Sequence, residues 1–265
     1  MNDNAPLVAT LVNGLRILET VVTADSESVG VTDVANRLRL HKSTVLRLLL
    51  TLESEGYVEQ DPRTREFRPR MKLFELGSAV LARTDLVKVA RPMLEELGKL
   101  SGEVVHLAVL DQGEVVYIDK VESQHVIQMY SRVGRRSPAH CTGVGKALLA
   151  FLPSPEVDRI IQERGLRRFT GSTITDPAQL KEHLKEIRAR GFAVDEEEHE
   201  AGIRCLAAPI YNHRGQVVAS ISIAAPALRF TKERVDEMAG PTLTIARRVS
   251  AALGYRPAEA GARRA

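Results

Sequence analysis

Hydrogen-bonding side chains gather on one side of a basic segment that begins at Lys42. Ser43, Thr44 and Arg47 share this side on a helical wheel, and Lys42 stands where unpaired backbone N–H groups favour a phosphate. Hydroxyl and guanidinium groups can bond the edges of DNA bases in the major groove. Residues 34–52 contain four Lys or Arg and no Asp or Glu that would repel a DNA backbone. The alternative is a solvated face on an ordinary helical hairpin.

A helix with one apolar side would position these groups. Apolar residues recur at i, i+3, i+4 and i+7, which predicts an amphipathic helix over residues 42–54: Val45, Leu48, Leu49 and Leu52. A shorter helix over residues 33–38, with Thr32 as its N-cap, and a turn over residues 39–41 would precede it. Similar spacing predicts a first helix over residues 7–23, which would brace this helix-turn-helix.

A hairpin follows the basic helix. Residues 57–60 and 66–68 have the pattern of two short strands around a Pro-led turn. Arg63 and Arg65 stand at the tip of this turn, where they could reach phosphates or a narrow minor groove. Arginines are common at surface turns, so the hairpin is informative only together with the helices that precede it. The helix-turn-helix and the hairpin together predict a winged helix-turn-helix.

An apolar helix is predicted next, and the chain changes character after it. We expect a winged helix-turn-helix domain over residues 1–70, a linker helix over 71–84, a second domain over 85–255 and a disordered tail over 256–265. The apolar linker needs a partner. A second subunit would place two reading helices against two half-sites, and packing on the chain's own second domain is the alternative.

Strands and helices are predicted to mix in the second domain. The strands are expected at residues 103–110, 114–121, 126–130, 192–195, 205–211 and 216–223, and the helices around residues 86–100, 144–151, 155–164, 177–190 and 231–253. Strands at both ends with helices between them predict an α+β fold: an antiparallel sheet with flanking helices and a pocket for a small molecule.

A glycine-rich loop precedes one of these helices. The backbone N–H groups of Thr142 to Gly145 could hold an anionic ligand, although a simple helix-entry turn is the alternative. The loop is not a phosphate-binding P-loop, because His140 replaces the first Gly and Ala147 replaces the final hydroxyl residue. Residues 199–203 begin like a zinc-protease motif, but Ile203 replaces the second His. We therefore assign no catalytic residue, metal ligand or cofactor, and expect the acidic run 196–200 to be a solvated loop.

Composition fits a two-domain globular protein. The chain has 265 residues, 44% of them hydrophobic, and a net charge of +3, which is too small to indicate nucleic acid by itself. Its two cysteines, Cys141 and Cys205, lack the spacing of a zinc site or a disulfide framework. The sequence has no long apolar run and no signal-peptide core, so a cytoplasmic protein that does not bind membranes is expected.

Several motifs in order resemble the IclR family of bacterial transcription regulators, from about residue 11 to residue 254. They are GLRILE from Gly14, HKSTVLRLLLTLESEGYVEQ from His41, PAHCTGVGKALLAF from Pro138, TITD from Thr173, GFAVDEEEHEAGIRCLAAP from Gly191 and VVASISIAAP from Val217. The resemblance implies a GAF-like second domain that binds a small organic acid. It also implies a dimer or a dimer of dimers that binds a palindromic operator in double-stranded DNA, as a repressor more readily than as an activator.

The resemblance also implies effector-binding residues. They are Gly143 and Val144 through their backbone amides, Asp195, Cys205 and the first of two serines, Ser222. The second serine of the pattern falls on Ala224, which removes a hydroxyl and favours a larger or less polar effector. Ser220 shares that face of a regular strand and could substitute. Two alternatives remain at this stage: an enzyme that acts on small acids, and an architectural DNA binder without an effector.

Overall fold

The chain forms two compact units. A computed structural model describes residues 7–82, 85–123, 125 and 131–256. The units divide after Arg83, so the apolar linker helix belongs to the first of them. The predicted strand over residues 126–130 and all but the first residue of the predicted tail lie outside the described residues.

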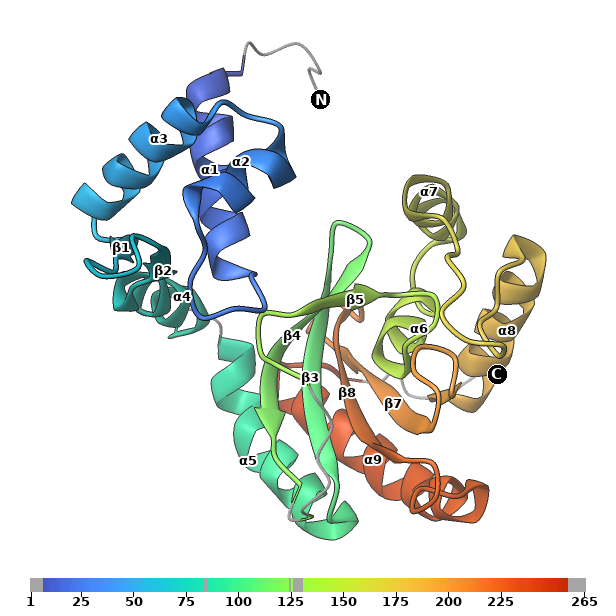
Figure 1. Ribbon diagram of the computed structural model, residues 1–265. Coiled ribbons are helices and arrows are strands. Elements are labelled where there is room, and N and C mark those ends of the chain that lie inside the picture. Colours follow the sequence, from blue (N-terminus) through green and yellow to red (C-terminus); the bar gives the residue numbers. More distant parts are fainter. Residues whose placement is uncertain (1–6, 83–84, 124, 126–130, 257–265) are drawn as a thin grey trace, which may run out of the picture. The chain divides into compact units, whose positions relative to one another are not determined.

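The first unit is a helix-turn-helix followed by a two-stranded wing (Figure 1). Its elements are α1 (Ala9–Val22), α2 (Val31–Leu38), α3 (Lys42–Ser54), β1 (Val58–Gln60), β2 (Phe67–Pro69) and α4 (Met71–Ala82). The apolar sides of α1, α2 and α3 meet in one core with Ile17, Val34, Leu49 and Phe67 at its centre. This core turns the opposite side of α3 to solvent.

The start of α2 differs from the sequence prediction. The helix begins at Val31, and Gly30 rather than Thr32 is its N-cap residue. The extended backbone of Gly30 presents its carbonyl to the N–H groups of Asp33 and Val34. The Gly30 carbonyl accepts the first hydrogen bonds of the helix, so the helix begins before Thr32. Thr32 therefore lies inside the first turn and does not cap it.

The second unit contains one antiparallel sheet with helices on both faces (Figure 1). Its elements are α5 (Asp85–Ser101), β3 (Val104–Asp111), β4 (Glu114–Val121), β5 (Arg136–Pro138), α6 (Gly143–Leu149), α7 (Ser154–Arg164), α8 (Pro177–Arg190), β6 (Ala193–Glu196), β7 (Ile203–Tyr211), β8 (Val217–Pro226) and α9 (Lys232–Ala252). The strand order is β5-β4-β3-β8-β7-β6. The three-residue β5 lies in a stretch where the sequence predicted neither strand nor helix, because so short an edge strand has little pattern of its own.

Alternation along the strands separates two cores. Ile221 and Ile223 of β8 pack with α5 and α9, whereas Ser222 and Ala224 face the opposite side. On that side, α6, α7 and α8 cover a second core that includes Val144. The sheet face beside α6 is therefore the one that can present polar side chains to a ligand.

Candidate functional site: the reading face and an internal cavity

The predicted nucleic-acid face of α3 lies in solvent. Lys42, Ser43 and Arg47 are exposed and Thr44 is half-buried, while Val45, Leu48 and Leu49 point into the core. Within residues 7–82, no ion pair engages Lys42 or Arg47. Two positive charges and two hydroxyls therefore remain available on the solvent-facing side of one helix.

A turn of fixed shape presents the wing arginines. The Asp61 side chain accepts hydrogen bonds from the backbone N–H groups of Arg63 (2.7 Å) and Thr64 (3.0 Å). Both hydrogen bonds lower the pKa of Asp61, and the bond from Thr64 has the larger effect. Arg63 and Arg65 are exposed, whereas the more distant Arg68 pairs with Glu59 at 2.6 Å. The tip arginines are therefore those left to reach phosphates.

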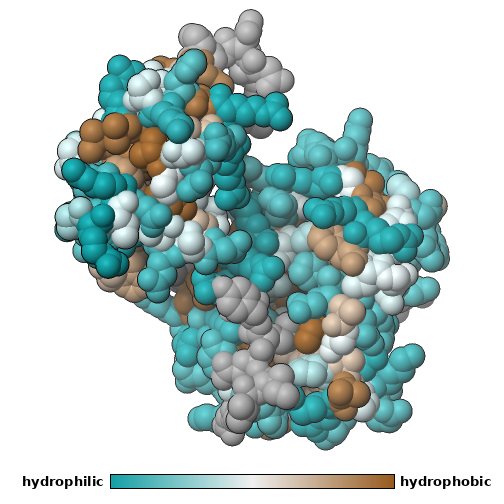
Figure 2. Space-filling view, in the orientation of Figure 1, coloured by the Kyte–Doolittle hydropathy of each residue, from teal (hydrophilic) through white to brown (hydrophobic). Residues whose placement is uncertain are grey.

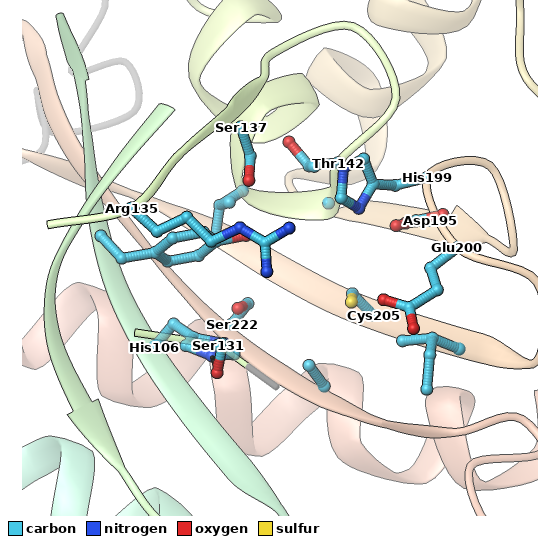
Figure 3. Close-up of a pocket in the computed structure, with 15 residues that line it drawn as sticks. His106, Ser131, Arg135, Ser137, Thr142, Asp195, His199, Glu200, Cys205 and Ser222 are labelled. Carbon is cyan, nitrogen blue, oxygen red and sulfur yellow. Dashed lines mark hydrogen bonds between the residues drawn. The ribbon is translucent and has the colours of Figure 1, made fainter. Parts of the chain in front are cut away.

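All five effector-binding residues predicted from the sequence line one cavity in the second unit. Its volume is about 40 Å³. Figure 3 shows Arg135 and Glu200 extending into it from opposite sides. The lining consists of Gly143, Val144, Asp195, Cys205 and Ser222 together with His106, Tyr117, Ser131, Arg135, Ser137, Thr142, His199, Glu200, Ile203 and Ala224.

The glycine-rich loop forms one wall of this cavity. Thr142 is the N-cap of α6, and its hydroxyl accepts a hydrogen bond from the N–H of Gly145 at 3.3 Å. The N–H groups of Gly143 and Val144 begin the helix and have no partner within it. A Cβ at Gly145 would lie 2.3 Å from the carbonyl oxygen of Ala139, closer than real atoms approach. The loop therefore needs glycine there to keep its amides at the cavity.

A buried carboxyl group faces these amides. Asp195 is 2% exposed, and its Oδ1 accepts a hydrogen bond of 2.7 Å from the N–H of Glu198. Burial raises the pKa of Asp195 to about 7, against the opposing effect of the Lys146 ammonium. Asp195 can therefore donate a proton to a bound carboxylate or accept a hydrogen bond from a hydroxyl. The same burial raises the pKa of Cys205 well above its ordinary value, so this thiol is no nucleophile.

A buried ion pair holds the loop and the Asp195 segment together. Lys146, on α6, is completely buried and pairs with Glu198, which is 4% exposed. Its Nζ also donates to the carbonyl of Val194 at 2.7 Å. The prediction of a solvated acidic loop is therefore wrong for Glu198, because the ammonium of Lys146 replaces its water. Both partners adjoin residues that line the cavity.

Neutral groups, the guanidinium of Arg135 and the carboxyl group of Glu200 form the remaining polar wall. Burial lowers the pKa of His106 to about 3, with a further contribution from Lys120, so the imidazole is uncharged at neutral pH. Its Nε2 lies 2.7 Å from the Ser131 hydroxyl. The guanidinium of Arg135 brings positive charge to the cavity, opposite the carboxylate of Glu200. An acid would meet the guanidinium of Arg135, the carboxyl group of Glu200, several hydroxyls and two amides without a hydrogen-bond partner among the described residues.

The position of the missing serine is clear from the strand β8. Ala224 lines the cavity, so the second hydroxyl is absent from the wall itself. Ser220 does not replace it, because the side chain is fully buried and donates its hydroxyl to the carbonyl of Ala208 at 3.0 Å. The wall at Ala224 is thus apolar, and Ile203 extends it.

Sequence reasoning missed several lining residues that bring chemistry, among them His106, Tyr117 and Arg135. His106 stands opposite Ser222 in the register of β3 and β8. A polar residue in the otherwise apolar run 104–110 was the available signal for it. For Arg135, the signal was a basic residue inside the loop that leads to the glycines.

The two units each match a family model over most of their length. The family model described as "IclR helix-turn-helix domain" matches residues 10–62, and the model described as "Bacterial transcriptional regulator IclR C-terminal" matches residues 78–251. This chain belongs to the IclR family. The winged helix-turn-helix, the antiparallel α+β domain and the resemblance read from the motifs are thereby confirmed.

Curated IclR-family relatives cover most of the chain. The HTH-type transcriptional regulator KdgR of Escherichia coli K12 is 39% identical over 231 residues, 87% of this chain and 88% of the relative. The transcriptional repressor IclR of the same organism is 36% identical and covers 93% of this chain and 90% of itself. The solved structure of an IclR homolog from Microbacterium hydrocarbonoxydans in complex with 4-hydroxybenzoate is 27% identical in sequence, with a TM-score of 0.80. The match covers 92% of this chain and 99% of the homolog.

The family excludes one of the two alternatives left by the sequence. Its members and these relatives are transcriptional regulators that bind DNA, so the small-acid enzyme is the wrong alternative. Across the described residues, no helix combines the length and apolar character needed to cross a membrane. The same residues contain no group of three or more His, Cys, Asp or Glu placed to hold a metal ion.

Proposed function

We propose that this IclR-family protein is a repressor that binds a palindromic operator through α3 and the wing, and that a small organic acid in the cavity changes its affinity for DNA. The observation that carries the proposal is the exposed face of α3. Lys42, Ser43, Thr44 and Arg47 lie there, and α3 has no acidic residue before Glu53. Arg63 and Arg65 add positive charge at the wing.

The cavity supports the effector part of the proposal. A carboxylate would accept hydrogen bonds from the N–H groups of Gly143 and Val144 and from the Ser222 hydroxyl, with Arg135 supplying charge. Asp195 would bond a hydroxyl or the acid itself. The solved homolog with 4-hydroxybenzoate shows that one member of the family holds an acid. The small volume and the apolar Ala224 favour an acid with a short apolar group.

Self-association completes the proposal. Both α1 and α4 leave large apolar side chains in solvent: Leu11 (61% exposed), Leu15 (52%), Met71 (67%), Phe74 (67%) and Leu76 (47%). Covering them with a second copy removes apolar area from water and presents two α3 helices to two half-sites. We expect a dimer or a dimer of dimers. Light scattering on Phe74→Glu should show a smaller species than the parent protein forms.

Mobility shifts test the proposed DNA contacts. The full chain should bind the DNA upstream of its own gene saturably, with an affinity that falls as salt rises. Arg47→Ala with Thr44→Ala should weaken binding at least tenfold, since each base contact contributes roughly 1–3 kcal/mol. Arg159→Ala, on α7 of the other unit, is the matched control. Unchanged binding by the double variant would remove α3 as the reading element.

A second measurement tests the effector. Short carboxylic acids are screened for a rise in the melting temperature of the full chain, and each one that binds is added to the mobility shift. By linkage, an effector must bind free and DNA-bound protein with different affinities. Equal affinities for every acid that binds would show that the cavity does not control DNA binding.

A further inference from the structure

Two leucines lie in solvent on the reading face of α3. Leu46 is 39% exposed and Leu50 45%, although neighbouring apolar residues of the helix are in the core. On the helical wheel, Leu50 falls beside Ser43 on the side away from Arg47, near the centre of the side opposite the core. Figure 2 shows hydrophobic residues at the surface of this unit in the region of α3, among hydrophilic ones. The face is therefore polar and apolar together.

The spacing makes one contact surface of the two side chains. They are four residues apart, so they are neighbours on the same face of the helix. A single exposed leucine needs no explanation, but here the pair lies within the groups already assigned to base reading. Hydrogen-bonding groups recognise the polar atoms of base edges, whereas thymine also carries a methyl group in the major groove.

We propose that Leu46 and Leu50 contact the 5-methyl groups of thymines and thereby select thymine at defined operator positions. The inference rests on the proposed binding of α3 in the major groove. Charge favours DNA over a second protein copy as the occupant of this face, because Lys42 and Arg47 flank the leucines and Arg37 and Arg39 precede them. Glu53, the first acid of α3, is engaged with the N–H of Gln60 at 2.8 Å.

Replacing thymine by uracil isolates the methyl group. Full-length protein first selects its tightest-binding duplex from a random pool, and each thymine of that duplex is then changed to deoxyuridine singly. The hydrogen-bonding groups of the base stay the same, and only the methyl is lost. We expect about fourfold weaker binding at each contacted position, the value of one buried methyl or methylene group. Other thymines should be insensitive.

Two variants assign the effect to the leucines. Leu46→Ala and Leu50→Ala should each bind the parent duplex more weakly and lose the preference for thymine over uracil at their own positions. Leu100→Ala removes a leucine that is 53% exposed on α5, and it should retain the full preference. Both leucines of α3 are at the surface, so the variants should melt at the parent temperature.

The outcomes separate this inference from the function on which it rests. A duplex that binds tightly with uracil at every position would overturn the thymine contact and leave DNA binding intact. Sensitivity that persists in both leucine variants would assign the methyl contact to other residues, such as Thr44, and also overturn it. Leucine variants that change the size of the oligomer and keep the thymine preference would show that a second copy covers the face. Failure to select any duplex would remove both.

Discussion

Lys146→Met tests how strongly the buried ion pair beside the cavity stabilises the second unit. The substitution keeps the length and apolar stem of the side chain but leaves Glu198, 4% exposed, without its cation. One carboxylate oxygen of Glu198 already has no hydrogen-bond partner among the described residues. Removing one member of such a pair costs roughly 3–5 kcal/mol, because the remaining charge stays buried. At roughly 2–4 °C per kcal/mol, the second unit should melt about 6–20 °C lower.

Calorimetry on the full chain measures this change as the shift of the transition of the second unit. Lys185→Met is the matched control, since Lys185 pairs with Glu182 at 2.7 Å and both side chains are exposed. Such a surface pair contributes about 0–1 kcal/mol. Lys146→Met combined with Glu198→Met should recover most of the loss, because apolar replacement of a whole buried pair is often neutral. A single variant within about 1 kcal/mol of the parent, or a double variant worse than the single one, would refute the argument.

Three further predictions concern the cavity. Ala224→Ser restores the absent hydroxyl, and one added hydrogen bond should tighten the binding of short hydroxy acids by about two- to tenfold in titration calorimetry; unchanged affinity would show that this wall does not touch the ligand. Because burial raises the pKa of Asp195 to about 7 from 3.8, the folded protein keeps a proton between pH 4 and 7 that the unfolded chain releases. The stability that this group contributes is present at low pH and declines as the pH rises through that window. In urea unfolding, the free energy of unfolding of Asp195→Asn should therefore rise relative to that of the parent as the pH increases. A difference that stays constant with pH would contradict the raised pKa. Burial also raises the pKa of Cys141 to about 12 and that of Cys205 well above its ordinary value, so neither thiol should react with iodoacetamide at neutral pH until the chain unfolds, as mass spectrometry can follow.

Local sequence patterns were enough to predict the helices of the first unit and the helix that follows the glycine-rich loop. The apolar spacing of Val45, Leu48 and Leu49 determines which side of α3 meets the core, so its exposed residues follow from the sequence alone. The helix predicted after the glycine-rich loop is also present as α6, and the structure adds that Thr142 is its N-cap. The apolar spacing within one helix was therefore readable from the sequence, whereas the N-cap of α2 lies at Gly30 and not at the predicted Thr32.

Long-range pairing explains what the sequence did not reveal. Glu198 is buried only because Lys146, 52 residues earlier, reaches it from α6. His106 adjoins the cavity because β3 pairs with β8, which places it opposite Ser222. Ser220 and Ser222 share a face by simple alternation, yet only Ser222 lines the cavity, since Ser220 bonds the carbonyl of Ala208. Pairing partners across a sheet leave no mark in a single sequence.

The close approach of backbone atoms at Gly145 has a consequence for engineering. No side chain, not even a methyl group, fits between Ala139 and Thr142, so the amide wall tolerates no redesign at that point. A biosensor for a different acid would keep residues 139–145 intact and vary the opposite side at Ile203 and Ala224, whose side chains come from strands and can change size without moving the main chain. In the proposed binding mode, the loop amides, Ser222 and Arg135 hold the carboxylate, and the side chains at positions 203 and 224 set which acid fits.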